Sequence, residues 1–170
     1  MKYTLEIQKR LLQVENGNLS PHEKALLLKE AIRIADENDD PQWAVEMRLD
    51  LIYELNLLSQ AEEEIAVFSR ILDDYENNKD LISENDILWK YKWICGAAFD
   101  VPEVSQSQID AILEDFKIRT LRNGYSARAY YHLLFLHYNR MRQYDLAKEY
   151  ADKMLSEKLD DMICEACELN

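Results

Sequence analysis

The sequence predicts an all-α protein of about eight antiparallel helices. Three observations support this. Gly and Pro occur only three times each among 170 residues, whereas Leu, Ala, Glu, Lys and Arg recur throughout, a composition that favours helix. Apolar residues return at helical spacing, and helix-capping residues recur along the chain. The expected helices span 2–15, 21–38, 41–57, 60–78, 84–99, 106–122, 127–140 and 144–157.

Capping residues predict where the helices begin. In "SPHE", Ser20 is the N-cap, Pro21 takes the first helical position and Glu23 completes a capping box. "DDPQW" repeats this arrangement with Asp40 before Pro41. Further N-caps are expected for the later helices, at Ser59 in a second capping box and at Ser83, Ser105 and Ser126.

Between the caps, apolar residues follow one face of each expected helix. The helix over 60–78 shows this with Ala61, Ile65, Phe68, Leu72 and Tyr75. Its three acidic residues at 62–64 are interpreted as a solvated helix start that the helix dipole favours. Connections mostly of two to six residues make neighbouring helices antiparallel.

The last hairpin, "AYYHLLFLHYNRMRQYDLAKEYADKML", resembles the tetratricopeptide repeat, best over residues 129–158. Tyr131 stands at the first aromatic position, Leu134 at the leucine, Tyr138 at the tyrosine and Ala147 at the first alanine of the second helix. The hairpin departs from the motif at Phe135, Ala151, Met154 and Leu159.

The length predicts a single domain over 1–170. The resemblance, which covers residues 41–158 in architecture and the last hairpin by motif, implies that helical hairpins stack as an α-solenoid. The hairpins are expected at 2–38, 41–78, 84–122 and 127–157, followed by a tail over 158–170. Stacking buries the apolar face that a lone repeat cannot bury. A closed helical bundle is the alternative. The chain also resembles the N-terminal part of longer bacterial repeat proteins.

Charge and composition exclude several classes of protein. A net charge of −13 disfavours general binding to nucleic acid or to an anionic membrane. Three cysteines are too few for a disulfide framework, which favours a reducing cytoplasm. The N-terminus lacks the apolar run of a signal peptide, and no stretch reaches membrane-spanning length.

No catalytic constellation is evident. The sequence has no phosphate-binding glycine loop, no nucleophile elbow and no H-E-x-x-H motif. We therefore expect no enzymatic activity and no cofactor.

The pair Cys164 and Cys167 in "CEAC" has the spacing of half a zinc site or of a redox dithiol. No second spaced pair exists, and Cys95 lies on an expected apolar stripe. We expect these cysteines to pack against the last hairpin or to begin a further helix, and they are only weak metal candidates.

A basic island interrupts the acidic chain. From Phe116 to Tyr144 there is no acidic residue, and the stretch carries Lys117, Arg119, Arg122, Arg128, Arg140 and Arg142. With the nearby tyrosines, these cations could recognise an acidic peptide or a carboxylate. The alternative is that they pair with acidic faces such as "DDYENNKD" or the tail, within one molecule or between two. Stacked nucleic-acid bases are a third, less favoured ligand.

The stretch "ILWKYKWICG" interleaves two tryptophans with lysines, which is typical of a peptide-binding helix face, although core packing competes with that interpretation. In the repeat family the first helix of each hairpin lines the groove. The resemblance thereby implies groove positions at Leu49, Tyr53, Trp89, Lys92, Gly96, His132, Leu136 and Arg140.

The sequence thus predicts a non-enzymatic protein-interaction module that binds an acidic or extended segment of a partner. The expected binding residues are Tyr53, Trp89, Lys92, Trp93, Arg128, His132, Leu136 and Arg140. Glutamate at Arg128 and Arg140 is expected to abolish binding without unfolding the domain. The alternatives are a ligand- or peptide-responsive regulatory domain of a longer protein and a structural unit that forms homo-oligomers.

Overall fold

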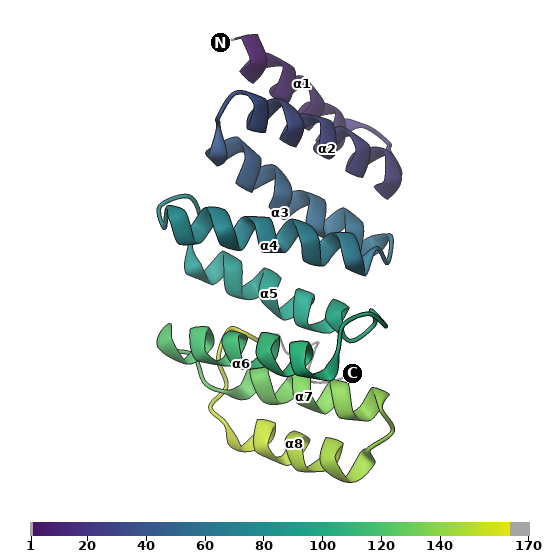
Figure 1. Cartoon of the computed structure of the whole chain (residues 1–170), viewed down its shortest axis with the longest axis vertical. Coiled ribbons are helices and arrows are strands. Elements are labelled where there is room, and N and C mark those ends of the chain that lie inside the picture. Colours follow the sequence, from purple (N-terminus) through teal and green to yellow (C-terminus); the bar gives the residue numbers. More distant parts are fainter. Residues whose placement is uncertain (1, 164–170) are drawn as a thin grey trace. The chain divides into compact units, whose positions relative to one another are not determined.

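The computed structural model describes residues 2–163, which form eight α-helices (Figure 1). The predicted all-α fold is confirmed, and no helix boundary differs from its predicted position by more than one residue. The helices are α1 (Lys2–Asn16), α2 (Pro21–Glu37), α3 (Pro41–Leu57), α4 (Ala61–Asn77), α5 (Glu84–Ala98), α6 (Gln106–Arg122), α7 (Arg128–Arg140) and α8 (Tyr144–Ser156).

Side-chain caps begin three of these helices as the sequence predicts. Ser20 and Glu23 form the expected capping box at α2, and Ser105 forms another with Gln108 at α6. Asp40 accepts a hydrogen bond from the Trp43 amide at 3.2 Å and so caps α3. Each cap satisfies backbone N–H groups that the first helical turn leaves without a partner.

Two predicted caps are wrong. α4 is preceded by Gln60, which makes no side-chain cap, because Ser59 belongs to the end of α3 and has a φ of 55°. α7 begins at Arg128, with Ala127 in the N-cap position, so Ser126 stands one residue too early. Its hydroxyl nevertheless accepts a hydrogen bond from the Arg128 amide at 3.2 Å.

Four helices end in the same left-handed turn. After α3, the Ser59 amide donates to Asn56 O at 3.0 Å and the Gln60 amide to Leu55 O at 3.0 Å, the two bonds of a Schellman motif. The left-handed residue of the equivalent turns is Asp39 after α2, Gly124 after α6 and Arg142 after α7. Only one of the four positions is therefore the glycine that this conformation favours.

The chain divides into two compact units, Met1–Ser83 and Glu84–Asn170. In the first unit α2 packs on α1, α3 on α2 and α4 on α3, while the described parts of α1 and α4 make no contact. The unit is therefore a row of stacked helices and not a closed four-helix bundle. Its core is formed by Ile7, Ala25, Leu28, Ala31, Ile32, Ile34, Ala35, Ala44, Met47, Leu51 and Leu55.

Two glutamates of the first unit are buried. Glu64 is 1% exposed, which contradicts the expectation that residues 62–64 form a solvated helix start. It lies against α3, where the Asn56 amide nitrogen is 3.5 Å from both of its carboxylate oxygens. Glu54 is 5% exposed, and one of its two oxygens has no hydrogen-bond partner.

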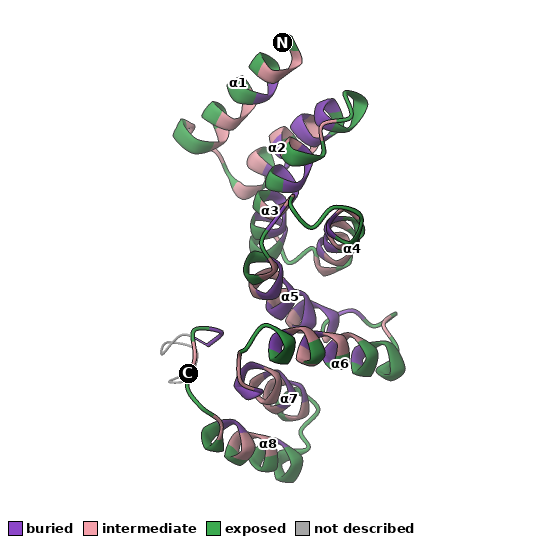
Figure 2. Cartoon of the chain, turned by 90° about the vertical axis from the view of Figure 1, so that its left-hand side faces the viewer, coloured by how far each residue is buried: buried purple, intermediate pink, exposed green. Residues whose placement is uncertain are grey.

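In the second unit α5 packs on both α6 and α7, and α7 packs on α6 and α8. Figure 2 shows buried residues concentrated along α5 and α7. The interior includes Leu88, Cys95, Leu113, Phe116, Leu133 and Leu134. Two residues beyond α8, Met162 and Ile163, are also buried, at 0% and 4% exposed. The chain after the last helix therefore contributes to the core of this unit.

Within residues 2–163, no helix combines the length and apolar character needed to cross a bilayer.

Candidate functional site

The most informative site lies where the segment after α8, residues 157–163, returns over α7 and α5. The helix ends because Glu157 adopts an extended backbone, with φ −79° and ψ 152°. The segment then runs beside α7 (Figures 1 and 2). It contains no helix, so its backbone groups need partners elsewhere. We call residues 157–163 the return segment.

Arg128 holds the start of the return segment. It is 6% exposed, and its Nη1 donates to Met154 O at 3.0 Å and to Glu157 O at 2.8 Å. The first bond is to a carbonyl in the last turn of α8. The second is to the carbonyl of Glu157, the first residue after that helix. A single guanidinium nitrogen, Nη1, thus bridges the two carbonyls, and a charged donor makes both bonds stronger than neutral ones.

Ser126 and Asp160 form the second connection. The Ser126 amide donates to Asp160 Oδ2 at 2.6 Å, and the Ser126 hydroxyl donates to Lys158 O at 2.8 Å. Asp160 Oδ1 accepts from the Met162 amide at 3.0 Å and fixes a turn in the segment. The carboxylate thus lies just before α7, where the helix dipole favours negative charge.

Lys92 makes the third connection. It is 8% exposed, and its Nζ donates to Met162 O at 2.7 Å while lying 3.9 Å from the centroid of the Trp89 ring. The buried ammonium is therefore stabilised by a carbonyl and by an aromatic face. Burial of the Met162 and Ile163 side chains adds about 1.5–3 kcal/mol each.

The face continues beyond Met162. Gly96 lies one helical turn after Lys92, and a Cβ placed on it would meet nothing within 4 Å. Beside it, Arg140 Nη1 donates to Gly96 O at 3.2 Å and to Asp100 Oδ1 at 2.9 Å. Arg140 and Asp100 are 47% and 60% exposed in their side chains, so this ion pair is weak and can exchange partners.

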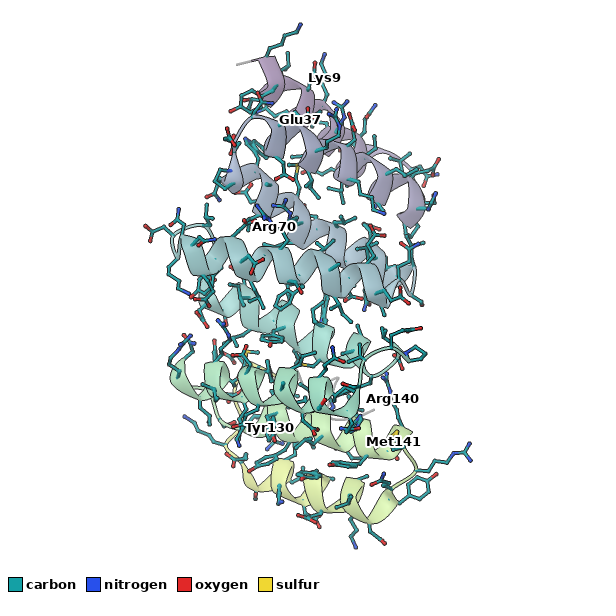
Figure 3. The ribbon with its side chains drawn as sticks, viewed as in Figure 1. Lys9, Glu37, Arg70, Tyr130, Arg140 and Met141 are labelled. Atoms are coloured by element: carbon teal, nitrogen blue, oxygen red, sulfur yellow. The ribbon has the colours of Figure 1, made fainter. Side chains whose placement is uncertain are left out.

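The predicted residues of α5 and α7 all lie in the second unit, where Arg140 of α7 contacts Gly96 of α5. Trp89 and Trp93 are half-buried, and Lys90 Nζ lies 4.5 Å from the Trp93 ring centroid. His132 and Leu136 are half-buried on α7. We call the set Trp89, Lys92, Trp93, Gly96, His132, Leu136 and Arg140 the α5–α7 face. Figure 3 shows Arg140 at the end of α7 opposite to Tyr130.

Tyr53 and Leu49 lie on α3 of the first unit, where Tyr53 is 47% exposed and Leu49 is half-buried. They belong to a different unit from the α5–α7 face.

The basic island is largely paired inside the second unit. Arg119 contacts Asp115 at 2.9 Å, and Arg122 contacts Glu84 at 3.0 Å. Lys117 Nζ lies 3.4 Å from Glu114 Oε2. The alternative of pairing within one molecule therefore accounts for most of these cations. The tail contributes a main-chain group, because Arg128 donates to the carbonyl of Glu157.

Burial of Arg128 changes the expected test of the site. Because its guanidinium satisfies interior carbonyls, glutamate at this position would place a carboxylate against two carbonyl oxygens. We now expect that variant to destabilise the second unit, so it does not isolate a binding role. Arg140, which is exposed, remains suitable for such a test.

The first unit contains a hollow of about 510 Å³, which is lined by Asp36, Asp39, Asp40, Pro41, Arg48, Arg70 and Asp74. Arg48 bonds to both oxygens of Asp36, at 2.8 and 2.7 Å, and to Asp74 at 3.0 Å. Arg70, labelled in Figure 3, contacts Asp74 at 3.3 Å. The two arginines of this hollow are therefore paired with Asp36 and Asp74, and the four aspartates outnumber them.

Cys95 is completely buried, and this burial, reinforced by the charge of Asp115, raises the pKa of its thiol. A protonated interior thiol is a poor nucleophile and a poor metal ligand. No group of side chains suited to a metal ion occurs within residues 2–163. Cys164 and Cys167 lie outside the described residues.

Sequence reasoning missed Ser126, Asp160, Met162 and Ile163 as parts of the site. One signal was present: Met162 and Ile163 form an apolar pair in an otherwise acidic stretch beyond the last predicted helix. Such a pair needs a surface on which to be buried.

Comparisons of this chain with protein-family models, with curated proteins and with solved structures gave no match.

Proposed function

We propose that this protein is a non-enzymatic interaction module whose α5–α7 face binds a non-helical, acidic segment of a partner protein. The observation that supports the proposal best is the return segment, which is held by Lys92 of this face and by Ser126 and Arg128 at the start of α7. These three residues bond to carbonyl oxygens and to one carboxylate. Groups of that kind are present in any chain that carries an aspartate at the right position.

The return segment indicates the chemistry of the preferred partner. An aspartate is followed, two residues later, by two consecutive apolar residues, as in Asp160, Met162 and Ile163. The aspartate would bind at the start of α7, and the apolar pair would supply the buried anchor. Beyond that pair, the exposed Arg140 beside Gly96 can bind a further carboxylate of the partner by donating hydrogen bonds to it.

A matched pair of variants at Gly96 tests the proposal. Alanine there meets no atom within 4 Å and removes a glycine from a helix, so binding should be unchanged. Tyrosine should fill the open face and weaken binding of the partner segment at least tenfold. The measurement is isothermal titration with synthetic peptides that carry Asp-x-Met-Ile followed by acidic residues, with circular dichroism confirming that both variants fold.

A second comparison addresses the charge of the partner. Arg140→Glu should weaken binding of peptides that are acidic after the Met-Ile pair and should not affect peptides that end there. Equal affinity of the parent and both Gly96 variants for every peptide would contradict the assignment of this face.

Self-association is a second candidate function, favoured by exposed apolar side chains in the first unit. Leu5, Leu12 and Leu26 are 54%, 57% and 54% exposed. A hollow of about 470 Å³ between α1 and α2 is lined by Leu19, Leu26 and Leu27 together with Gln13, Gly17 and Glu23. Analytical ultracentrifugation tests this candidate: Leu12→Lys and Leu26→Lys should convert a dimer into a monomer, whereas a parent that is monomeric at all concentrations excludes it.

A further inference from the structure

We infer that the return segment is a ligand held in cis, which a partner segment of the same chemistry must displace from the α5–α7 face. This inference rests on the function proposed above and adds regulation to it. Binding at this face would then depend on release of the chain's own residues 158–163.

The contacts of the return segment support a displaceable ligand. The helices of the second unit pack on one another directly, α5 on α6 and α7, and α7 on α8. The return segment is not one of these helices, although it buries Met162 and Ile163 against them, and its polar contacts with α5 and with Ser126 use two carbonyls and one carboxylate. A partner segment in the same position can reproduce all three contacts, so the exchange keeps these hydrogen bonds.

The connection to α8 makes the cis ligand effective. Only Glu157 to Asp161 separate the end of α8 from Met162, so the segment cannot move far when it is released. A short connection gives an effective concentration in the millimolar range. If the segment would bind in trans with a dissociation constant of about 0.1 mM, its presence in cis weakens the apparent affinity of a partner segment roughly tenfold. This is the size of effect that a binding experiment can resolve.

Asp160 and Met162 provide the means to weaken the cis ligand selectively. Asp160 accepts the Ser126 amide and the Met162 amide, and the Met162 side chain is fully buried. The neighbouring Asp161 is exposed. Asp161→Ala is therefore a matched control, because it removes a carboxylate from the same segment without removing these contacts.

The test uses the full chain and a fluorescein-labelled peptide, Glu-Lys-Leu-Asp-Asp-Met-Ile, with both ends blocked. Fluorescence anisotropy gives its dissociation constant for the parent, for the double variant Asp160→Ala with Met162→Ser, and for Asp161→Ala. We expect the double variant to bind the peptide at least tenfold more tightly than the parent, and Asp161→Ala to bind like the parent.

The outcomes separate this inference from the proposed function. If parent and double variant bind the peptide equally, the cis competition is wrong and the binding face stands. If neither binds at 1 mM peptide while both are folded, the proposed function is overturned as well.

A second measurement covers the case in which the double variant does not fold. Hydrogen exchange of the parent is then followed with and without millimolar unlabelled peptide. Faster exchange over residues 158–163 in the presence of peptide supports displacement, and an unchanged rate overturns it.

Discussion

The two units both bury cationic side chains, but they neutralise them differently. In the first unit Arg48, 7% exposed, bonds to the carboxylates of Asp36 and Asp74 on neighbouring helices. In the second unit Lys92 and Arg128, 8% and 6% exposed, donate to backbone carbonyls at the end of α8 and in the return segment. The first arrangement pairs a cation with acidic side chains, whereas the second pairs cations with main-chain carbonyls and, at Lys92, with the Trp89 ring.

This difference shows which surface is suited to another polypeptide. A buried cation with a carboxylate partner is specific to its own helix pair, because removing either charge leaves the other unpaired. A cation bonded to carbonyls accepts any backbone in the right position. The second unit is therefore where we propose a peptide-binding face, and the interior ion pairs of the first unit stabilise its helix packing.

Arg48 gives the largest expected effect. Arg48→Met should destabilise the first unit by about 3 kcal/mol, because Asp74, which is only 12% exposed, would lose a charged partner. Urea unfolding followed by circular dichroism measures the change. Arg70→Ala is the control: Arg70 is 61% exposed, so its ion pair with the same aspartate should contribute less than about 1 kcal/mol. A comparable loss from both variants would contradict the role given to Arg48.

Arg128 gives a smaller effect with a different signature. Arg128→Met should cost about 2 kcal/mol, because two carbonyls lose a charged donor but can be hydrated once the return segment opens. Amide hydrogen exchange over residues 158–163 should be faster in this variant than in the parent. Arg128→Lys should lose less stability than Arg128→Met, since an ammonium is still a charged donor for these carbonyls. A loss of stability without faster hydrogen exchange over residues 158–163 would contradict the claim that Arg128 holds the return segment.

The capping serines should behave alike in both units. Ser20→Ala in the first and Ser105→Ala in the second should each cost about 1 kcal/mol, because each serine hydroxyl accepts an amide of the first helical turn. Ser59→Ala should change stability little, since Ser59 makes no N-cap for α4. Thermal unfolding of the three variants distinguishes true caps from the predicted one.

The left-handed turns give the smallest effect. Ser59→Gly and Arg142→Gly should each stabilise the protein by about 0.5 kcal/mol, because both positions have a φ that glycine adopts without strain. Gly124→Ala, at a φ of 83°, should cost about 1 kcal/mol. Chemical denaturation measures all three. Stabilisation by alanine at Gly124 would contradict the turn assignment.

The sequence predicted the helices well because their signals are local. Pro21 and Pro41 follow capping residues, and the apolar spacing within each helix is regular. The error at Ser59 shows the limit of local patterns. The sequence around this serine matches an N-cap for α4, but in the structure Ser59 is the left-handed residue of the turn that ends α3.

The site was predicted only in part because its decisive contacts join distant positions. Lys92 and Met162 are 70 residues apart, and Arg128 reaches carbonyls that carry no side-chain signal. The sequence of the basic island therefore resembled that of a free binding surface, although most of its cations form ion pairs within the second unit. Of the groove positions that the family resemblance implied, Gly96 and Arg140 are in contact, because Arg140 donates to Gly96 O.

Hydrogen exchange of the unmodified chain, followed by mass spectrometry, tests the central claim most directly. The account predicts slow exchange in peptides that cover Ser126 and Met162, because both amides donate to the carboxylate of Asp160. Exchange of the segment 158–163 at the rate of an unstructured peptide would contradict the account, since the α5–α7 face would then hold no ligand of its own.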